Sequence, residues 1–279
     1  MNEGRSRSVG RSLLLAAAWL AASVGLAGCT APRITAGSPA PGIALGATIE
    51  RAGVLTSEEA FPRRPVTVRY ERFRGGSETA DRGAVEVRFA ADPEGFRVDR
   101  FAFQSTPRGS EAGGSAAGGA PPEIDRRSRF IESADGSVLL AESAGGRDDV
   151  TTVFDPPAVI APASMRAGET AESRFVPRSK ESGGERRGNG EGLARVTYVG
   201  AQRVTTPLGT FDADLVLTEL VLDFGVVKIE RTQRRWVAAV SPGVRTVVAE
   251  DLVELQRVFG LTRTNRFRLA AVSVDTDPE

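Results

Sequence analysis

The sequence predicts a mainly β protein, with a curved antiparallel sheet that forms a half-barrel or open barrel and few short helices. Three observations predict this class. Apolar and polar side chains alternate at 66–71 (VTVRYE) and 85–89 (VEVRF), as in strands with one face in water. Tight-turn signals separate such stretches, whereas helical periodicity is nearly absent. Several stretches near the C-terminus exceed the usual strand length of about 5–6 residues, which favours a curled sheet.

The N-terminal half of the predicted sheet consists of short strands. They are expected at 66–71, 85–89, 95–104, 129–133 and 137–142. The last two flank Asp135-Gly136, a strong hairpin signal because both residue types tolerate the backbone angles of a tight turn. The main helix candidate is a short segment at Ser57–Ala60, with Ser57 as the candidate N-cap.

The C-terminal half of the predicted sheet has longer strands. They are expected at 193–198, 210–224, 226–240, 244–255 and 258–270. Turns are expected at Phe224-Gly225 and at Ser241-Pro242-Gly243. Long antiparallel strands joined by tight turns indicate a sheet that is at least partly closed.

Two glycine-rich inserts interrupt the strands, at 105–122 and 179–192. Both lack apolar residues to bury and are therefore predicted to be mobile loops. The second has Arg186 and Arg187 among its glycines, but its spacing matches no Walker or Rossmann motif, so a solvated loop is favoured over a phosphate site. The folded body is predicted over 47–270, either as one unit or as lobes at 47–160 and 161–270, followed by an acidic tail at 271–279.

The composition excludes several classes of function. Basic and acidic side chains number 36 each, so no broad positive field attracts nucleic acid, and no nucleic-acid partner is expected. The chain has no histidine, which removes Ser-His and Cys-His nucleophiles and imidazole metal sites. No metal and no cofactor is predicted, and the protein is expected not to be an enzyme.

A group of carboxylates near the long strands is the strongest catalytic candidate. Its members are Asp212, Asp214, Glu219, Asp223 and Glu230. Paired carboxylates can act as general acid and base or hold a divalent ion. Exposed ion pairs with neighbouring cations explain the group more simply, the cations being Lys228, Arg231, Arg234 and Arg235. No catalytic residue is assigned, and a carboxylate-based hydrolase ranks third among the functional hypotheses.

The N-terminal segment resembles the export signal of bacterial lipoproteins. Arg5, Arg7 and Arg11 precede an apolar run at 13–26 with the length of a signal-peptide core rather than a membrane span. The run ends in LAGC at 26–29, which resembles a lipobox: an aliphatic residue, two small residues and the cysteine that becomes the lipidated N-terminus.

This resemblance implies how the chain is processed and anchored. Residues 1–28 would be a signal peptide cleaved between Gly28 and Cys29, and 29–46 would form the lipidated cysteine and a flexible tether. Lipid chains on Cys29 would hold the protein on the membrane. Thr30 after the cysteine, by resemblance to enterobacterial lipoproteins, implies the periplasmic face of the outer membrane.

The C-terminal half resembles uncharacterised bacterial envelope proteins. The resemblance rests on VTTPLGTFDADLVLTE at 204–219, on Trp236 followed by Ser-Pro-Gly-Val at 241–244, and on MRAGET at 165–170. Arg245 stands where a second glycine is usual in the Pro-Gly-Val turn. Such proteins are similar in architecture to the lipoprotein carriers LolA and LolB, whose half-barrel covers an apolar cavity.

Together these features predict a non-enzymatic, membrane-anchored envelope lipoprotein that binds or carries an apolar ligand such as a lipid. The alternative is a structural or assembly partner that presents a sheet edge or flat face to another envelope protein. Aromatic residues on or beside the long strands are candidates for core or cavity lining: Phe211, Phe224, Trp236, Phe259 and Phe267.

Overall fold

The computed structural model describes residues 42–50, 53–74, 83–93, 95–103, 124–145, 150–181 and 186–276. The predicted signal peptide, Cys29 and the insert at 105–122 lie outside these residues. No helix among the described residues is long and apolar enough to cross a membrane.

Twelve antiparallel strands form a closed barrel. Seven come from the first part of the chain: β3 (Val66–Arg74), β4 (Gly83–Asp92), β5 (Gly95–Phe103), β6 (Ile124–Glu132), β7 (Val138–Gly145), β8 (Val150–Ala161) and β10 (Thr170–Glu181). Five longer strands follow: β12 (Glu191–Thr206), β13 (Gly209–Asp223), β14 (Val227–Ser241), β15 (Val244–Val258) and β16 (Leu261–Asp275). Pairing of β16 with β3 and of β12 with β10 closes the sheet.

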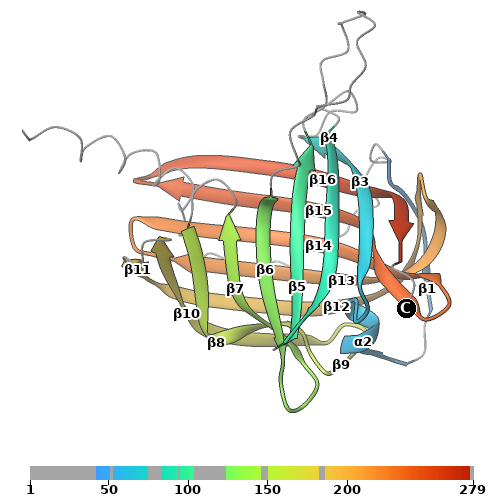
Figure 1. Ribbon diagram of the computed structural model, residues 1–279, viewed down its shortest axis with the longest axis horizontal. Coiled ribbons are helices and arrows are strands. Elements are labelled where there is room, and N and C mark those ends of the chain that lie inside the picture. Colours follow the sequence, from blue (N-terminus) through green and yellow to red (C-terminus); the bar gives the residue numbers. More distant parts are fainter. Residues whose placement is uncertain are drawn as a thin grey trace, which may run out of the picture.

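The two groups of strands form two layers that cross each other. Figure 1 shows β12 to β16 running along the long axis of the molecule, with β3 to β10 lying across them. Crossed layers of this kind are joined at their corners by strands that bend from one layer into the other. The sides of the two layers that face each other enclose the interior of the barrel.

Short elements complete the fold. β1 (Ala44–Ile49) pairs with the end of β12 that β10 leaves free, and β11 (Arg186–Asn189) pairs with β10. β2 (Val54–Thr56) and β9 (Ser164–Arg166) form a two-stranded sheet next to α2 (Ser57–Ala60).

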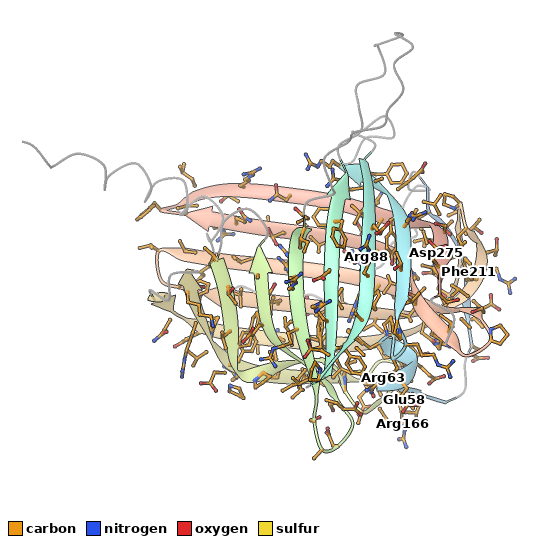
Figure 2. All side chains as sticks on the ribbon, in the orientation of Figure 1. Glu58, Arg63, Arg88, Arg166, Phe211 and Asp275 are labelled. Atoms are coloured by element: carbon orange, nitrogen blue, oxygen red, sulfur yellow. The ribbon has the colours of Figure 1, made fainter. Side chains whose placement is uncertain are left out.

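The helix α2 and the residues after it plug one end of the barrel. The Phe61 ring packs against the rings of Phe89, Phe96 and Phe130, with centroid distances of 6.0, 6.0 and 4.8 Å. Figure 2 places Glu58, Arg63 and Arg166 around this end. We call it the plug end.

The cap of α2 differs from the prediction. Thr56 is the N-cap and forms a capping box with Glu59. Ser57, the predicted cap, instead donates its hydroxyl to the carbonyl oxygen of Gly136 at 2.7 Å. The helix therefore docks onto the β6–β7 hairpin through the residue that was expected to cap it.

The outer face of the barrel carries cross-strand ion pairs. Asp251, for example, lies within 3.1 Å of Arg266, 3.4 Å of Arg268 and 3.6 Å of Arg234. Figure 2 shows charged side chains over this surface, including Arg88. Charged ladders of this kind are typical of a strand face in contact with water.

The predicted fold class is confirmed, and the sheet closes completely. The predicted turns at Asp135-Gly136, Phe224-Gly225 and 241–243 join β6–β7, β13–β14 and β14–β15. The closed ladder hides the long edges that a half-barrel would leave exposed.

Other expectations about element boundaries were wrong. No strand was predicted at β8 or β10, and both contain proline, which lacks the backbone N–H that a ladder uses. The insert at 179–192 is not wholly a loop, since β10 continues to Glu181, β11 pairs with it and β12 begins at Glu191. β16 continues to Asp275, well into the predicted tail.

Candidate functional site

Two adjoining cavities lie inside the barrel, with volumes of about 170 and 120 Å³. They share the side chains of Arg126, Leu140, Ser143, Leu220 and Arg231. Every second residue of a strand faces the interior, so the strands on both layers contribute to the walls. We call this space the barrel cavity.

The barrel cavity changes from apolar to charged along the crossing strands. On β6 the inward residues are Phe130, Ser128 and Arg126, and their partners on β5 are Phe96, Val98 and Arg100. Phe130 and Phe96 contact the Phe61 plug, so the arginines lie away from it. We call the opposite end, which contains Arg126, the arginine end.

Glu254 on β15 is the most strongly held carboxylate of the arginine end. It accepts hydrogen bonds from Arg231 Nε at 2.9 Å and from Gln256 Nε2 at 2.6 Å. Burial alone would raise the pKa of Glu254, but the charges of Arg231 and Arg126 and these hydrogen bonds lower it to about 2. Glu254 is therefore ionised at neutral pH, and Arg231 is its partner.

Arg126 has no such partner. Within the described residues its guanidinium makes no hydrogen bond and no ion pair, although it lines both cavities. The positive charge of Arg231, followed by burial, lowers the pKa of Arg126 to about 10, and Glu254 only partly offsets this. The folded chain thus holds a charged group in surroundings that disfavour the charge.

Arg235 and Arg100 are also poorly neutralised. Arg235 is buried, and among the described residues it donates only long hydrogen bonds, at 3.4 Å to the carbonyl of Ile160 and 3.3 Å to the hydroxyl of Thr218. Burial lowers its pKa, against the attraction of Glu250. Arg100 Nη1 lies 3.9 Å from Glu250, and its guanidinium carbon lies 4.8 Å from the centroid of the Phe267 ring.

Four arginines therefore face two carboxylates inside the barrel: Arg100, Arg126, Arg231 and Arg235 against Glu250 and Glu254. The Nε atoms of Arg100 and Arg235 and one oxygen of Glu250 lack hydrogen-bond partners among the described residues. Buried polar atoms are nearly always satisfied in folded proteins. The cavity wall therefore carries two more arginines than carboxylates, a balance of charge that favours an anion over a cation.

A second buried charge lies near the plug end and is well satisfied. Asp214 is fully buried. It accepts a hydrogen bond from the hydroxyl of Tyr198 at 2.8 Å and forms an ion pair with Arg245 Nη2 at 2.5 Å. Arg245 Nε also donates to the carbonyl of Glu59 in α2 at 3.0 Å. The arginine at the unusual turn position thus ties the plug to the long strands.

The predicted carboxylate group is dispersed by the structure. Asp212 pairs with Arg203 and Asp223 pairs with Lys228, both at 2.8 Å or less, on the outside of the barrel. The expectation of exposed pairing was wrong for Asp214, which is buried, and for two of the cations, Arg231 and Arg235, which face the interior. Among the described residues no group of three or more acidic or cysteine side chains is placed to hold a metal ion.

The five predicted aromatic residues lie outside the barrel cavity walls. Trp236 faces away from the interior, in an apolar cluster with Ile43 and Leu215, and donates its indole N–H to Gln202 at 3.1 Å. Phe211 lines a separate hollow near the β12–β13 hairpin.

The remaining candidates lie near the strand ends or beside Arg100. Phe224 packs in its hairpin against Val227, and Phe267 lies beneath Arg100. The prediction for Phe259 was wrong: its side chain is 73% exposed in the β15–β16 turn. The aromatic side chains that line the larger cavity are instead those of Phe61, Phe89, Phe130 and Tyr70.

A signal for the charged wall is present in the sequence of β14. Val227 and Ile229 are buried, and the same alternation places Arg231, Gln233 and Arg235 on their face. Continuing the period of two from the apolar residues would therefore have placed two arginines inside. On β5 the same alternation leads from Phe96 and Val98 to Arg100. Arg126 on β6 has no such signal, because that strand mixes apolar and polar residues on both faces.

Comparison with known proteins adds little. No protein-family model matches the chain, and no curated protein matches it. Among solved structures, the chain is similar to a crystal structure described as that of a lipoprotein from Parabacteroides distasonis ATCC 8503, with a TM-score of 0.35 and 8% sequence identity over 77% of this chain and 97% of that chain. A likeness this low carries no argument, and the resemblance to LolA and LolB stays a prediction.

Proposed function

We propose that the protein is a membrane-anchored, non-enzymatic lipoprotein of the cell envelope whose closed barrel binds a small, largely apolar ligand. One observation carries the proposal: the barrel cavity is enclosed by apolar side chains at the plug end and yet is not filled by them. Protein interiors are normally close-packed, so an unfilled interior of this size is a candidate binding site.

The size of the barrel cavity limits the ligand. An apolar cavity of roughly 150 Å³ accommodates a molecule such as benzene. The two cavities, at about 170 and 120 Å³, therefore fit a short acyl chain or a ring-sized molecule rather than a whole phospholipid. The ligand class is accordingly narrower than the lipid expected from the sequence.

The lipid anchor is the part of the proposal that rests on the lipobox at 26–29. Its test is incorporation of labelled palmitate into the full chain expressed in a bacterial host, with Cys29→Ala as the control. We expect the parent chain to incorporate labelled palmitate and the Cys29→Ala variant to incorporate none. Equal labelling of both chains would remove the anchor from the proposal.

The test of binding is native mass spectrometry with organic extraction. The protein is the chain from residue 29 onward carrying Cys29→Ser, purified without detergent. Ser143→Leu adds a side chain where both cavities meet, and Ala144→Leu is the matched control next to it on β7. A small apolar molecule should accompany the parent and the control but not Ser143→Leu. Empty protein in all three would overturn the proposal.

Assembly with another envelope protein is the second candidate, and one surface favours it. Val226, Phe259 and Leu261 are 59%, 73% and 77% exposed at neighbouring hairpins, where the Phe259 N–H donates to the carbonyl of Val226 at 3.3 Å. Phe259 has a φ of +47°, a costly conformation for a bulky side chain. A photo-crosslinker at position 259 should capture one discrete partner in the envelope if this candidate holds, and none if it does not.

A further inference from the structure

Arg100 and Arg126 are directly opposite each other on the neighbouring strands β5 and β6. Opposite residues in an antiparallel pair have Cβ atoms about 4.5–5.5 Å apart, and like charges in this position repel each other. The next pair on the outer face shows the usual arrangement: Arg127 is opposite Asp99 and forms an ion pair with it at 2.7 Å. Arg97 is also opposite Arg129 on the outer face, but each of these lies within 3.3 Å of a carboxylate, Asp99 and Glu142 respectively. Among the described residues of this ladder, Arg100 and Arg126 are the opposite arginines that have no carboxylate at hydrogen-bond distance.

Both arginines of the pair have donors to spare. Arg126 makes no hydrogen bond or ion pair within the described residues, and Arg100 Nε lacks a hydrogen-bond partner there. The carboxylate oxygens nearest to Arg100 belong to Asp125 and Glu250, at 3.8 and 3.9 Å, beyond the range of a hydrogen bond. An anion near both guanidinium groups would satisfy the free donors and replace repulsion by attraction.

Space for such an anion lies beside Arg126. Its partner on the other neighbouring strand, β7, is Gly145, which has no side chain. A Cβ placed on Gly145 would meet no atom of the described residues within 4 Å. Gly145 and Arg126 both line the smaller cavity, so the open space is continuous with the guanidinium.

We infer that this arginine pair binds the carboxylate of a short- or medium-chain fatty acid, whose alkyl chain extends toward the plug end. The inference rests on the proposed function, because it names the ligand of the same cavity. The planar guanidinium matches a carboxylate in a two-point contact. The alkyl chain then extends along the inward-facing residues of β5 and β6, past Val98 and Ser128 toward Phe130, where the cavity walls are apolar.

The inference is tested by calorimetric titration of three probes into the delipidated chain from residue 29 onward carrying Cys29→Ser. The probes are octanoate, 1-octanol and acetate, which separate the anionic group from the alkyl chain. Octanoate should bind at least about tenfold more tightly than 1-octanol, because a charged hydrogen bond adds to the same apolar contact. Acetate should bind most weakly, because it reaches only the arginines.

Two variants assign the effect to the pair. Arg126→Gln should remove the advantage of octanoate over 1-octanol and leave 1-octanol binding unchanged. Arg127→Gln is the matched control on the outer face of the same strand, where Arg97 still pairs with Asp99 at 3.2 Å, and it should keep the advantage.

The outcomes separate this inference from the proposal on which it rests. Equal binding of octanoate and 1-octanol to the parent chain would overturn the anionic ligand but keep an apolar one. Binding of neither probe would overturn both. An octanoate advantage that survives Arg126→Gln would show that the arginine pair is not the anion site.

Discussion

The two ends of the barrel treat buried charge in opposite ways. Near the plug end, the buried carboxylate of Asp214 is held by Tyr198 and Arg245, and the same arginine binds the backbone of α2. At the arginine end, Arg126 makes no hydrogen bond and no ion pair among the described residues, and it is opposite another arginine. The fold thus neutralises the buried charge of Asp214 but leaves the charge of Arg126 without an ion pair among the described residues.

This difference shows that the excess of arginines over carboxylates is a local feature of the barrel cavity. A charged group without a partner is costly in a protein interior, and its removal frequently stabilises the fold. Groups that are kept at such a cost are common at binding sites. Loss of the buried charge at the plug end is accordingly expected to lower the stability, whereas loss of the Arg126 charge at the arginine end is expected to raise it.

The largest effect is expected for Asp214→Ala. This change leaves the Tyr198 hydroxyl and Arg245 without their shared partner, and loss of one member of a buried ion pair costs about 3 kcal/mol or more in the free energy of unfolding. Urea unfolding followed by circular dichroism measures it. Asp212→Ala, on the outer face of the same strand, removes an exposed pair with Arg203 and should cost far less. Equal losses would show that the plug end does not depend on its buried pair.

The second effect concerns pH and Glu254. Its pKa is about 2 in the folded chain, below the ordinary value of 4.5, so the unfolded chain takes up the proton first as pH falls. The stabilisation, about 3 kcal/mol, is present above pH 4.5 and is lost as pH falls toward 2. Glu254→Gln should flatten the fall in stability over this window, measured by urea unfolding at successive pH values. An unchanged pH profile would contradict the strong pairing with Arg231.

The third effect has the opposite sign. Arg126→Met removes a charge that the folded chain disfavours, since the pKa of Arg126 is lowered to about 10. The free energy of unfolding of the ligand-free protein at pH 7 should therefore rise by about 1–2 kcal/mol. Arg127→Met loses an ion pair on the outer face and should bring no gain. A loss of stability in Arg126→Met would mean that the arginine end is structural, like the plug end.

The sequence predicted the class of fold because its signals are local. Alternation in β3 and β4 and the turn residues at Gly136, Gly225 and Gly243 each act within a few neighbours along the chain. Closure of the barrel depends instead on pairing between β12 and β10, and on register, which no short stretch encodes. Two strands that were not predicted, β8 and β10, contain prolines and form through pairing with strands elsewhere in the chain.

The candidate site was harder to predict than the fold. Aromatic residues were expected in the cavity, yet Trp236 faces away from it and Phe259 lies in a turn. An apolar residue type indicates burial but does not say which side of a closed sheet it occupies. The arginine pair depends on the register of β5 against β6, which places Arg100 opposite Arg126. Composition and spacing alone contain no trace of that contact.

The smallest effect is expected for Gly145→Ala at the arginine end. The added methyl group meets no atom of the described residues, so the free energy of unfolding should change by less than about 0.5 kcal/mol. Gly95→Ala, in the β4–β5 hairpin near the plug end, is the contrast: its Cβ would lie 2.2 Å from the carbonyl oxygen of Phe130, and its φ is +154°. Thermal unfolding should therefore show a clear loss for Gly95→Ala and almost none for Gly145→Ala. A clear loss for Gly145→Ala would mean that the space beside Arg126 is already filled, and that no anion is needed to occupy it.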